Sequence, residues 1–289
     1  MPEPETVFRS AAVRTLGNRV GAVAVADVAS GRLLTVHNLP LASRRLVRPG
    51  SIVKPFTLIA LLESNTITPD TALICRRQLR LAGRELDCVH VRTPEPLDAV
   101  AALAYSCNWF FAEAAARLSN AELQQTFMRA GLGSRTGWSQ DEAVGTVTLS
   151  PNQDQLRLQA LGESNLMVTP LAVLSAYRKL ATRRLAADAA TAVVFSGLEA
   201  AVEYGTAQLA RPEGMKVAGK TGTSSADEGR WTHAWFAGFA PADKPEIAVV
   251  VFLERGHGGG DAAGIAREIF SAYQQARRAR GAAPKRGDR

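Results

Sequence analysis

The sequence contains no long hydrophobic run, since no stretch reaches the roughly 18 apolar residues that a membrane-spanning helix needs. Its first residues, Met1 to Glu5, include two acidic side chains and no apolar segment of the kind found in a secretory signal peptide. We therefore expect a chain that carries neither signal nor anchor. It is either soluble as made or begins inside a longer protein, and the sequence leaves both alternatives open.

Aromatic residues are scarce, at 6% of the 289 residues, but hydrophobic residues make up 46% and charged residues 21%. This balance excludes a globally disordered chain and suits one large folded domain. The net charge of +7 includes a cluster of basic residues near the C-terminus, and we expect residues 281–289 to form a disordered basic tail. No aromatic residues are interleaved with these charges, so no nucleic-acid partner is predicted.

Cysteine is also rare, with three in the chain. Cys75 and Cys88 flank a segment with Gly83 near its middle, which predicts a hairpin that brings the two thiols together. A disulfide between them, which would indicate an oxidising compartment, and a pair of reduced buried thiols are both compatible with this pattern. Neither cysteine belongs to a CxxC pair, so a zinc site is not predicted.

The order of predicted elements is strands, helices, strands and a final helix. A helical pattern covers 5–17, two strands lie between Val20 and Asn38, and helices are expected at about 51–64, 97–118, 120–130 and from Pro170 onward. Strands are expected at 215–223, 234–240 and 247–253, before a helix at about 261–279. The fold class is thus α/β (α+β): an antiparallel sheet flanked by helices, with an inserted all-helical subdomain.

Residues 1–280 are therefore expected to form a single domain. Its sheet lobe spans about 1–62 and 191–280, and its helical lobe spans about 63–190. A cleft between two such lobes is a usual place for a substrate site.

The first chemical motif is Ser51-Ile52-Val53-Lys54, which follows the break at Pro49-Gly50 and opens an apolar helix. Positions i and i+3 share a helix face, so the Lys54 amine can reach the Ser51 hydroxyl. A serine hydroxyl needs a base to become a nucleophile, and burial at a helix N-terminus lowers the pKa of a lysine enough to make it one. Read alone, the motif also fits a serine cap beside an exposed lysine.

The second motif is Ser106-Cys107-Asn108, in an apolar setting. Ser106 could relay a proton, and Asn108 could hydrogen-bond a lysine or a substrate amide. Taken alone, the motif fits a helix cap equally well.

The third motif, Lys220-Thr221-Gly222-Thr223, ends a predicted strand. Lys220 would supply positive charge, and the hydroxyls of Thr221 and Thr223 would bind a carboxylate. Gly222 has no side chain, so a substrate could lie flat along the strand. Residues 214–221 match the P-loop pattern formally, but no helix follows them, so nucleotide binding is not predicted.

Together the three motifs resemble the transpeptidase domain of the class B penicillin-binding proteins, and the resemblance extends from about Val20 to Tyr273. Further segments that carry it are 48–51, 88–90, 168–171, 204–207 and 234–239. The usual membrane anchor and N-terminal pedestal domain are not evident. The Gly-rich segment before Thr169-Pro170 reads Gly162-Glu163-Ser164-Asn165, where Glu163 is either a loop residue or a carboxylate able to activate water.

The resemblance implies a peptidoglycan D,D-transpeptidase. Ser51 would be acylated by D-Ala-D-Ala stem peptides or by β-lactams, with Lys54 as its base, Ser106 as proton shuttle and Asn108 orienting Lys54. Lys220, Thr221 and Thr223 would bind the terminal carboxylate, and the backbone N–H groups of Ser51 and Thr223 would form the oxyanion hole. Neither a cofactor nor a metal is required by this chemistry.

The same resemblance implies an extracytoplasmic location and a glycan-polymerising synthase in the membrane as a partner. A β-lactamase, a D,D-carboxypeptidase and a non-catalytic β-lactam sensor or scaffold remain alternatives on this fold. We find neither the Glu-x-x-Leu-Asn element of class A β-lactamases nor the Tyr-Gly-Asn of class D, since residues 204–206 read Tyr-Gly-Thr.

Overall fold

A five-stranded antiparallel sheet forms the centre of the computed structural model, which describes residues 4–226 and 229–281. Its strand order is β2-β1-β9-β8-β7. The strands span Gly21–Asp27 (β1), Leu33–His37 (β2), Ala218–Ala226 (β7), Trp231–Ala240 (β8) and Ile247–Leu253 (β9). The two ends of the chain therefore build one sheet, which confirms the predicted fold class.

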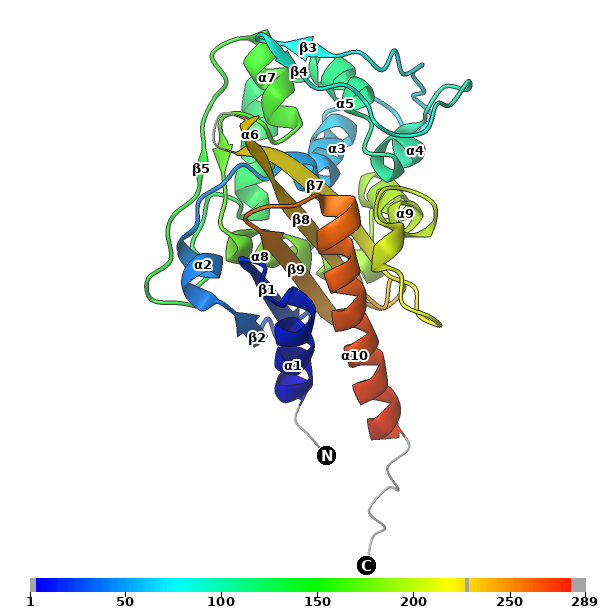
Figure 1. Ribbon diagram of the computed structural model, residues 1–289. Coiled ribbons are helices and arrows are strands. Elements are labelled where there is room, and N and C mark those ends of the chain that lie inside the picture. The colour runs from blue at the N-terminus through cyan, green and yellow to red at the C-terminus, as the bar shows by residue number, and fades with distance from the viewer. Residues whose placement is uncertain (1–3, 227–228, 282–289) are drawn as a thin grey trace, which may run out of the picture.

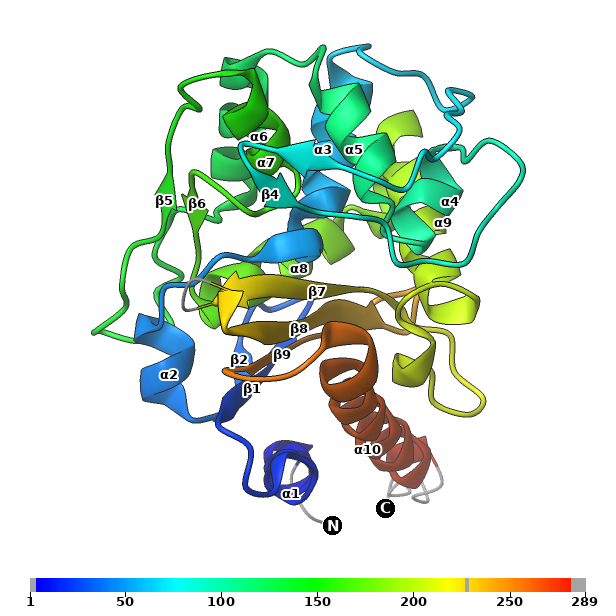
Figure 2. The same cartoon turned by 45° about the horizontal axis from the view of Figure 1, so that its top comes forward.

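Both faces of this sheet are covered, which explains why β9 is apolar throughout instead of alternating. Alternate side chains point to opposite faces. Val250 and Phe252 therefore join the larger hydrophobic core, and Val249 and Val251 join the smaller one. Figures 1 and 2 show α1 (Pro4–Leu16) and α10 (Ala263–Gly281) on the face of the smaller core, and the remaining helices on the other face.

The helices beyond the sheet come from the middle of the chain. They are α2 (Leu39–Arg44), α3 (Lys54–Glu63), α4 (Ala99–Ala104), α5 (Asn108–Ala115), α6 (Asn120–Ala130), α7 (Gln153–Ala160), α8 (Pro170–Thr182) and α9 (Ala189–Glu203). Two small ladders accompany them: β3 (Arg80–Leu81) with β4 (Arg84–Glu85), and β5 (Thr146–Val147) with β6 (Leu166–Met167). The ladder of β3 and β4 confirms the hairpin expected around Gly83.

Most predicted elements are present, and two of the local differences concern the site. The helix expected at 97–118 is divided into α4 and α5 by a turn at Ser106, whose φ is +56°. The strand expected at 215–223 begins at Ala218 and continues to Ala226. Both differences lie at segments that form the site described below.

The boundaries proposed for the two lobes remain predictions. Helix α8 falls within the sequence range of the helical lobe, yet it packs directly on β1, β8 and β9. The tail predicted to be disordered lies, from residue 282 onward, outside the described residues. Within the described part of the chain, none of the helices combines the length and apolar character needed to cross a membrane.

Candidate active site

Ser51 lies in a tight turn that is anchored from three directions. The turn is a short 3₁₀ helix, Gly50–Val53, that leads directly into α3, so the helix predicted from Ser51 begins in 3₁₀ form. The buried Tyr177 hydroxyl donates to the Ile52 carbonyl at 2.7 Å, and the Gly50 N–H donates to the Gly162 carbonyl at 3.0 Å. Ser224 on β7 donates to the Arg48 carbonyl at 2.7 Å. These bonds fix the Ser51 backbone against both α8 and the sheet.

Lys54 is the first residue of α3, and its side chain is fully buried. Its Nζ donates to the Ser106 carbonyl at 2.7 Å, to Ser106 Oγ at 3.2 Å and to Asn108 Oδ1 at 2.6 Å. Three acceptors match the three donors of an ammonium group. The structure thus joins the first two sequence motifs in one hydrogen-bond network.

Burial lowers the pKa of Lys54 to about 8, because a charged amine loses its hydration there. The acidic groups of Cys88, Cys107 and Glu163 oppose this shift through their charges. A lysine with a pKa near 8 is deprotonated in about a tenth of the molecules at pH 7, which makes it usable as a general base.

The break between α4 and α5 presents Ser106 to Lys54. At φ = +56° the backbone turns out of helical geometry, and Cys107 then caps α5 by accepting a hydrogen bond from the Phe110 N–H. A non-glycine residue with positive φ is a strained position that often marks functional sites. The turn aims both the carbonyl and the hydroxyl of Ser106 at one amine.

The third motif lies on β7, an edge strand of the sheet. Lys220 is fully buried, and its Nζ donates to the Thr221 carbonyl at 3.0 Å and to Thr206 Oγ1 at 3.5 Å. Thr221 Oγ1 donates to Thr206 Oγ1 at 2.8 Å. Burial and, secondarily, the charge of Lys54 hold the pKa of Lys220 well below its usual range.

Gly222 is required by packing within the protein itself. A Cβ built there would lie 2.8 Å from Ile52 Cγ2 and 3.0 Å from the Pro49 carbonyl oxygen. Gly50, with φ at +56°, makes the reciprocal approach, since its Cβ would lie 2.8 Å from the Thr223 carbonyl oxygen. The sequence analysis explained Gly222 by room for a substrate; the structure adds that its missing side chain lets β7 contact the Ser51 turn.

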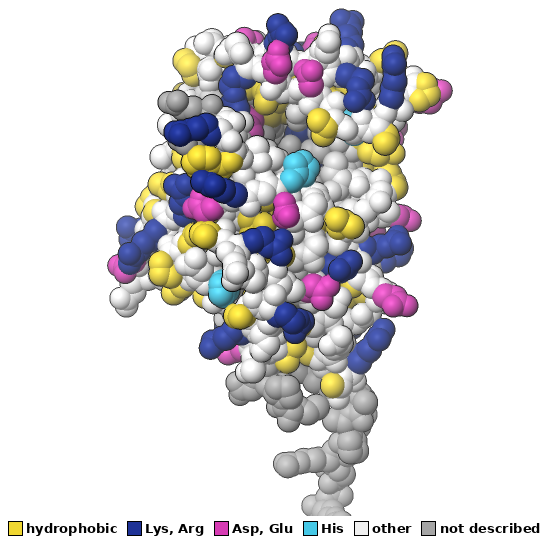
Figure 3. All heavy atoms as spheres, viewed as in Figure 1, with side chains coloured by type: hydrophobic (Ala, Val, Ile, Leu, Met, Phe, Trp, Pro, Cys, Tyr) yellow, Lys and Arg dark blue, Asp and Glu magenta, His cyan; other side chains and the backbone are white. Residues whose placement is uncertain are grey.

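A cavity of about 620 Å³ joins these segments. Six of the predicted site residues line it: Ser51, Ser106, Asn108, Thr221, Gly222 and Thr223. The two lysines, Lys54 and Lys220, are fully buried and do not line it. Figure 3 shows a recess in the upper half of one face of the molecule, with Lys and Arg side chains around it.

The structure adds contacts for residues outside the three motifs. Glu163 lines the cavity, and its carboxylate accepts a hydrogen bond from Arg84 Nη2 at 2.6 Å. Burial raises the pKa of Glu163, while Arg84 acts against that shift. Thr206, which accepts from both Lys220 and Thr221, lies in a segment quoted for the resemblance but given no function. Only the fold shows these contacts, because the partners are 14 to 79 residues apart.

Comparison with known proteins identifies the family of this chain. The family model of the penicillin-binding protein transpeptidase domain matches residues 21–271. Among curated proteins, the chain is 39% identical over 83 residues to the peptidoglycan D,D-transpeptidase MrdA of Acinetobacter baumannii, covering 24% of this chain and 12% of MrdA. It is 25% identical over 260 residues to stage V sporulation protein D of Bacillus subtilis, covering 77% of this chain and 40% of that protein. The chain thus spans well under half the length of these relatives.

Solved structures share the fold at low sequence identity. PBP2 of Pseudomonas aeruginosa superposes with a TM-score of 0.82 at 21% identity, over 92% of this chain and 76% of that one. The transpeptidase domain of penicillin-binding protein 3 from Burkholderia pseudomallei superposes with a TM-score of 0.82 at 23% identity, over 94% of both chains. PBP2 of Helicobacter pylori, solved in complex with MreC, gives 0.83 at 20% identity, over 93% of this chain and 62% of that one. With the family model matching most of its length, this chain belongs to the penicillin-binding protein transpeptidase domain family.

Proposed function

We propose that the protein is a serine D,D-transpeptidase that acts on D-Ala-D-Ala stem peptides through an acyl-enzyme on Ser51, and that β-lactams acylate the same residue. The observation that carries this proposal is the Lys54 amine. It is buried, has its pKa lowered to about 8, and bonds to Ser106 and Asn108 directly beside a cavity that Ser51 lines.

The proposed acylation begins with Lys54 in its neutral form. Loss of one proton leaves Nζ with two donors, enough for the Ser106 carbonyl and Asn108 Oδ1, and frees a lone pair. That lone pair accepts the Ser51 proton as Oγ attacks the carbonyl carbon of the penultimate D-alanine. The first N–H groups of a helix have no intrahelical partner, so that of Ser51 is one proposed donor to the oxyanion. The N–H of Thr223, on the edge strand β7, is the other.

Collapse of the tetrahedral intermediate breaks the peptide C–N bond. The departing D-alanine nitrogen needs a proton, and Ser106 Oγ, 3.2 Å from Lys54 Nζ, would pass it on. An amine of a second stem peptide then attacks the ester carbonyl and forms the cross-link. As the ester C–O bond breaks, one proton of that amine passes by way of Lys54 to the departing Ser51 Oγ.

The hydroxyls of Thr221 and Thr223, which line the cavity, would contact the carboxylate of the terminal D-alanine. Lys220, which is buried and bonds to the Thr221 carbonyl and to Thr206 Oγ1, would attract it by its positive charge. Its lowered pKa reflects a buried charge without a counter-ion among the groups that shift it. A substrate carboxylate would supply that counter-ion and favour the charged form. The side-by-side hydroxyls of Thr206 and Thr221 support the same anion-binding role.

A β-lactamase is the main alternative, and Glu163 is the residue that decides it. Its carboxylate lines the cavity, but it already accepts a hydrogen bond from Arg84. The ion pair with the arginine favours the ionised carboxylate and so makes it a weaker base toward a water molecule. We therefore expect a long-lived acyl-enzyme with nitrocefin, in a one-to-one stoichiometry, and not steady turnover.

The substrate class places the proposed activity on the outer side of the cytoplasmic membrane, where cell-wall cross-links form, and a glycan-polymerising synthase remains the proposed membrane partner. The test is release of D-alanine from a stem peptide ending in D-Ala-D-Ala, with cross-linked product measured by mass spectrometry. Ser51→Ala should abolish both products, whereas Ser196→Ala, an exposed serine on α9, should leave them unchanged. Release of D-alanine without any cross-link, at every amine acceptor concentration, would instead assign a carboxypeptidase.

A further inference from the structure

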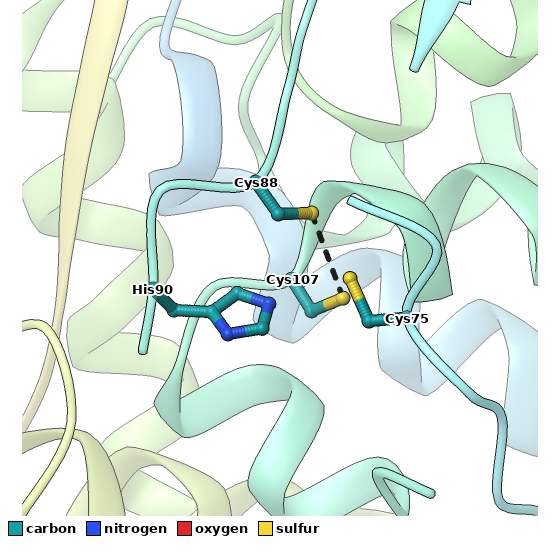
Figure 4. A group of neighbouring side chains, drawn as sticks. All are labelled: Cys75, Cys88, His90 and Cys107. Atoms are coloured by element: carbon teal, nitrogen blue, oxygen red, sulfur yellow. Dashed lines mark hydrogen bonds between the residues drawn. The ribbon is translucent and has the colours of Figure 1, made fainter. Parts of the chain in front are cut away.

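Three cysteines and one histidine converge beside the cavity, which Cys88 itself lines, and Figure 4 shows their side chains together. The sulfur atoms of Cys75, Cys88 and Cys107 and a ring nitrogen of His90 all lie within 4.8 Å of one another. All three cysteines are free, and Cys88, His90 and Cys107 are buried. The sequence predicted that Cys75 and Cys88 are neighbours. The third thiol, Cys107, comes from the middle of the Ser106-Cys107-Asn108 motif. Because the chain has no CxxC pair, the spacing of its cysteines did not predict the cluster.

The distances suit a shared ligand better than a disulfide. Cys88 Sγ lies 3.8 Å from Cys107 Sγ, whereas a disulfide requires about 2.05 Å. Two thiolates bound tetrahedrally to one zinc ion, each about 2.3 Å from it, are separated by roughly 3.8 Å. The observed separation is the edge length of such a tetrahedron.

His90 provides an independent observation. Its Nδ1 bonds to the Val91 carbonyl at 2.8 Å, so Nδ1 carries the proton and Nε2 presents a lone pair. Nε2 is buried and has no hydrogen-bond partner. Figure 4 shows it on the side of the ring that faces the sulfur atoms. Metal-binding histidines usually donate one ring N–H to a backbone carbonyl and direct the lone pair of the other ring nitrogen at the metal. His90 has this arrangement toward the cluster of thiols.

The backbone is arranged to stabilise negative charge on two of the sulfurs. The Trp109 N–H donates to Cys88 Sγ at 3.3 Å and the Phe110 N–H donates to Cys107 Sγ at 3.4 Å, both from the first turn of α5. A helix N-terminus with N–H donors favours a thiolate, which is the form that binds metal. Arg76, Arg77 and Arg92 line an adjacent hollow of about 230 Å³ with Cys75 and His90, so positive charge lies next to the thiols.

We propose that Cys75, Cys88, His90 and Cys107 form a tetrahedral Cys₃His site for a zinc ion that fixes the Ser106–Asn108 turn. Soft thiolates with one imidazole, in a closed set of four, select zinc and are typical of a structural site. The three thiolates and the ion carry a net charge of −1, which the neighbouring arginines balance.

The site would stabilise a part of the molecule with little other support. Between α3 and α4, the only regular structure in the described chain is the two-residue ladder of β3 and β4. Residues 85–89 of this segment nevertheless line the cavity, and Asn108 Nδ2 donates to the Leu86 carbonyl at 2.9 Å. A metal ion that joins Cys75 and Cys88 to Cys107 would attach this wall to the turn that carries Ser106 and Asn108. This structural role holds whatever reaction the cavity catalyses.

The test is the metal content of the full-length chain, purified without a histidine tag or chelator and measured by plasma mass spectrometry. We expect about one zinc per chain in the wild type, and less than a tenth of that in His90→Ala and Cys107→Ser. His37→Gln, a histidine outside the cluster, should retain the zinc. Cobalt substituted for zinc should give the strong visible absorption of a tetrahedral thiolate site.

A second measurement uses the wild-type protein, because a variant could lose zinc simply by failing to fold. Removing the metal from the wild type with a chelator should lower the Tm by roughly 5–15 °C, and added zinc should restore it. Metal-free wild-type protein with an unchanged Tm overturns the proposal. So does a Cys88–Cys107 disulfide, seen as two thiols that resist alkylation in denatured, unreduced protein. Loss of acylation with zinc retained would count against the proposed function and leave the metal site standing.

Discussion

At the scale of single residues, Lys54 holds the central position. It is fully buried, yet it interacts with several titratable groups. The charge of Lys54 lowers the pKa of Lys220, and Cys88, Cys107 and Glu163 raise that of Lys54. Its pKa near 8 reflects desolvation that these acidic groups only partly offset. The chemistry proposed for Ser51 depends on this balance.

The pH dependence of acylation follows from that pKa. Only the neutral amine accepts the Ser51 proton, so the second-order rate of penicillin acylation should rise about tenfold per pH unit up to pH 7 and level off above about 8. Stopped-flow or quenched labelling between pH 6 and 9 measures this profile. A rate that is flat over this range would contradict the role of Lys54 as the base.

Asn108→Asp should displace the same profile. A carboxylate 2.6 Å from Nζ stabilises the charged lysine, so the midpoint should move to higher pH and the rate at pH 7 should fall by about tenfold or more. Asn152→Asp is the matched control, because Asn152 caps α7 and aspartate caps a helix equally well. An unchanged midpoint in Asn108→Asp would show that this residue does not control the charge of Lys54.

At the scale of elements, the site depends on a glycine contact between β7 and the Ser51 turn. Gly222→Ala places a methyl group 2.8 Å from Ile52 Cγ2, which should destabilise the protein by about 1–3 kcal/mol and slow acylation as the turn shifts. Gly264→Ala on α10 is the control, since nothing lies within 4 Å of its Cβ and alanine favours a helix. Chemical denaturation and labelling rates measure both effects. Normal acylation in a folded Gly222→Ala variant would contradict this account of the contact.

The hydroxyl of Tyr177 links α8 to the same turn. Tyr177→Phe leaves the Ile52 carbonyl without its buried donor, which should lower the free energy of unfolding by about 1–3 kcal/mol. Tyr204→Phe, at a half-exposed ring, should change it far less. Equal losses in both variants, measured by urea unfolding, would show that the bond to Ile52 contributes nothing specific.

Elements with a clear periodicity or a run of apolar residues were predictable from the sequence, and β1, β8, β9 and α6 all occur where expected. The division of 97–118 was not, because the break is made by Ser106 with positive φ and no glycine or proline marks it. The contacts of Thr206, Arg84 and Cys107 were equally hidden, since each joins segments that only the tertiary fold brings together.

At the scale of the whole molecule, the cavity forms where three distant parts of the chain meet. Arg84 shows this most clearly: it comes from β4 and donates to the Glu163 carboxylate at 2.6 Å and to Ser225 on β7 at 3.4 Å. Arg84 therefore connects three segments at the edge of the cavity: the ladder of β3 and β4, the loop before β6, and the edge strand of the main sheet.

Removing Arg84 tests this connection. Arg84→Met leaves the buried Glu163 carboxylate without its partner and should destabilise the fold by about 2–4 kcal/mol, less than for a fully buried pair because Arg84 is partly exposed. Adding Glu163→Gln should recover much of that loss, because the unpaired charge is then gone. Thermal unfolding of the wild type, of Arg84→Met, of Glu163→Gln and of the double variant measures this coupling. A double variant no more stable than Arg84→Met would contradict it.

The central claim is that Ser51 is the nucleophile of this cavity. Its most direct test is peptide-mapped mass spectrometry of the folded protein after incubation with a penicillin. The account predicts one stable adduct per chain, located on Ser51 and absent from Ser51→Ala. An adduct on Ser106 or another residue, or none on correctly folded protein, would contradict it.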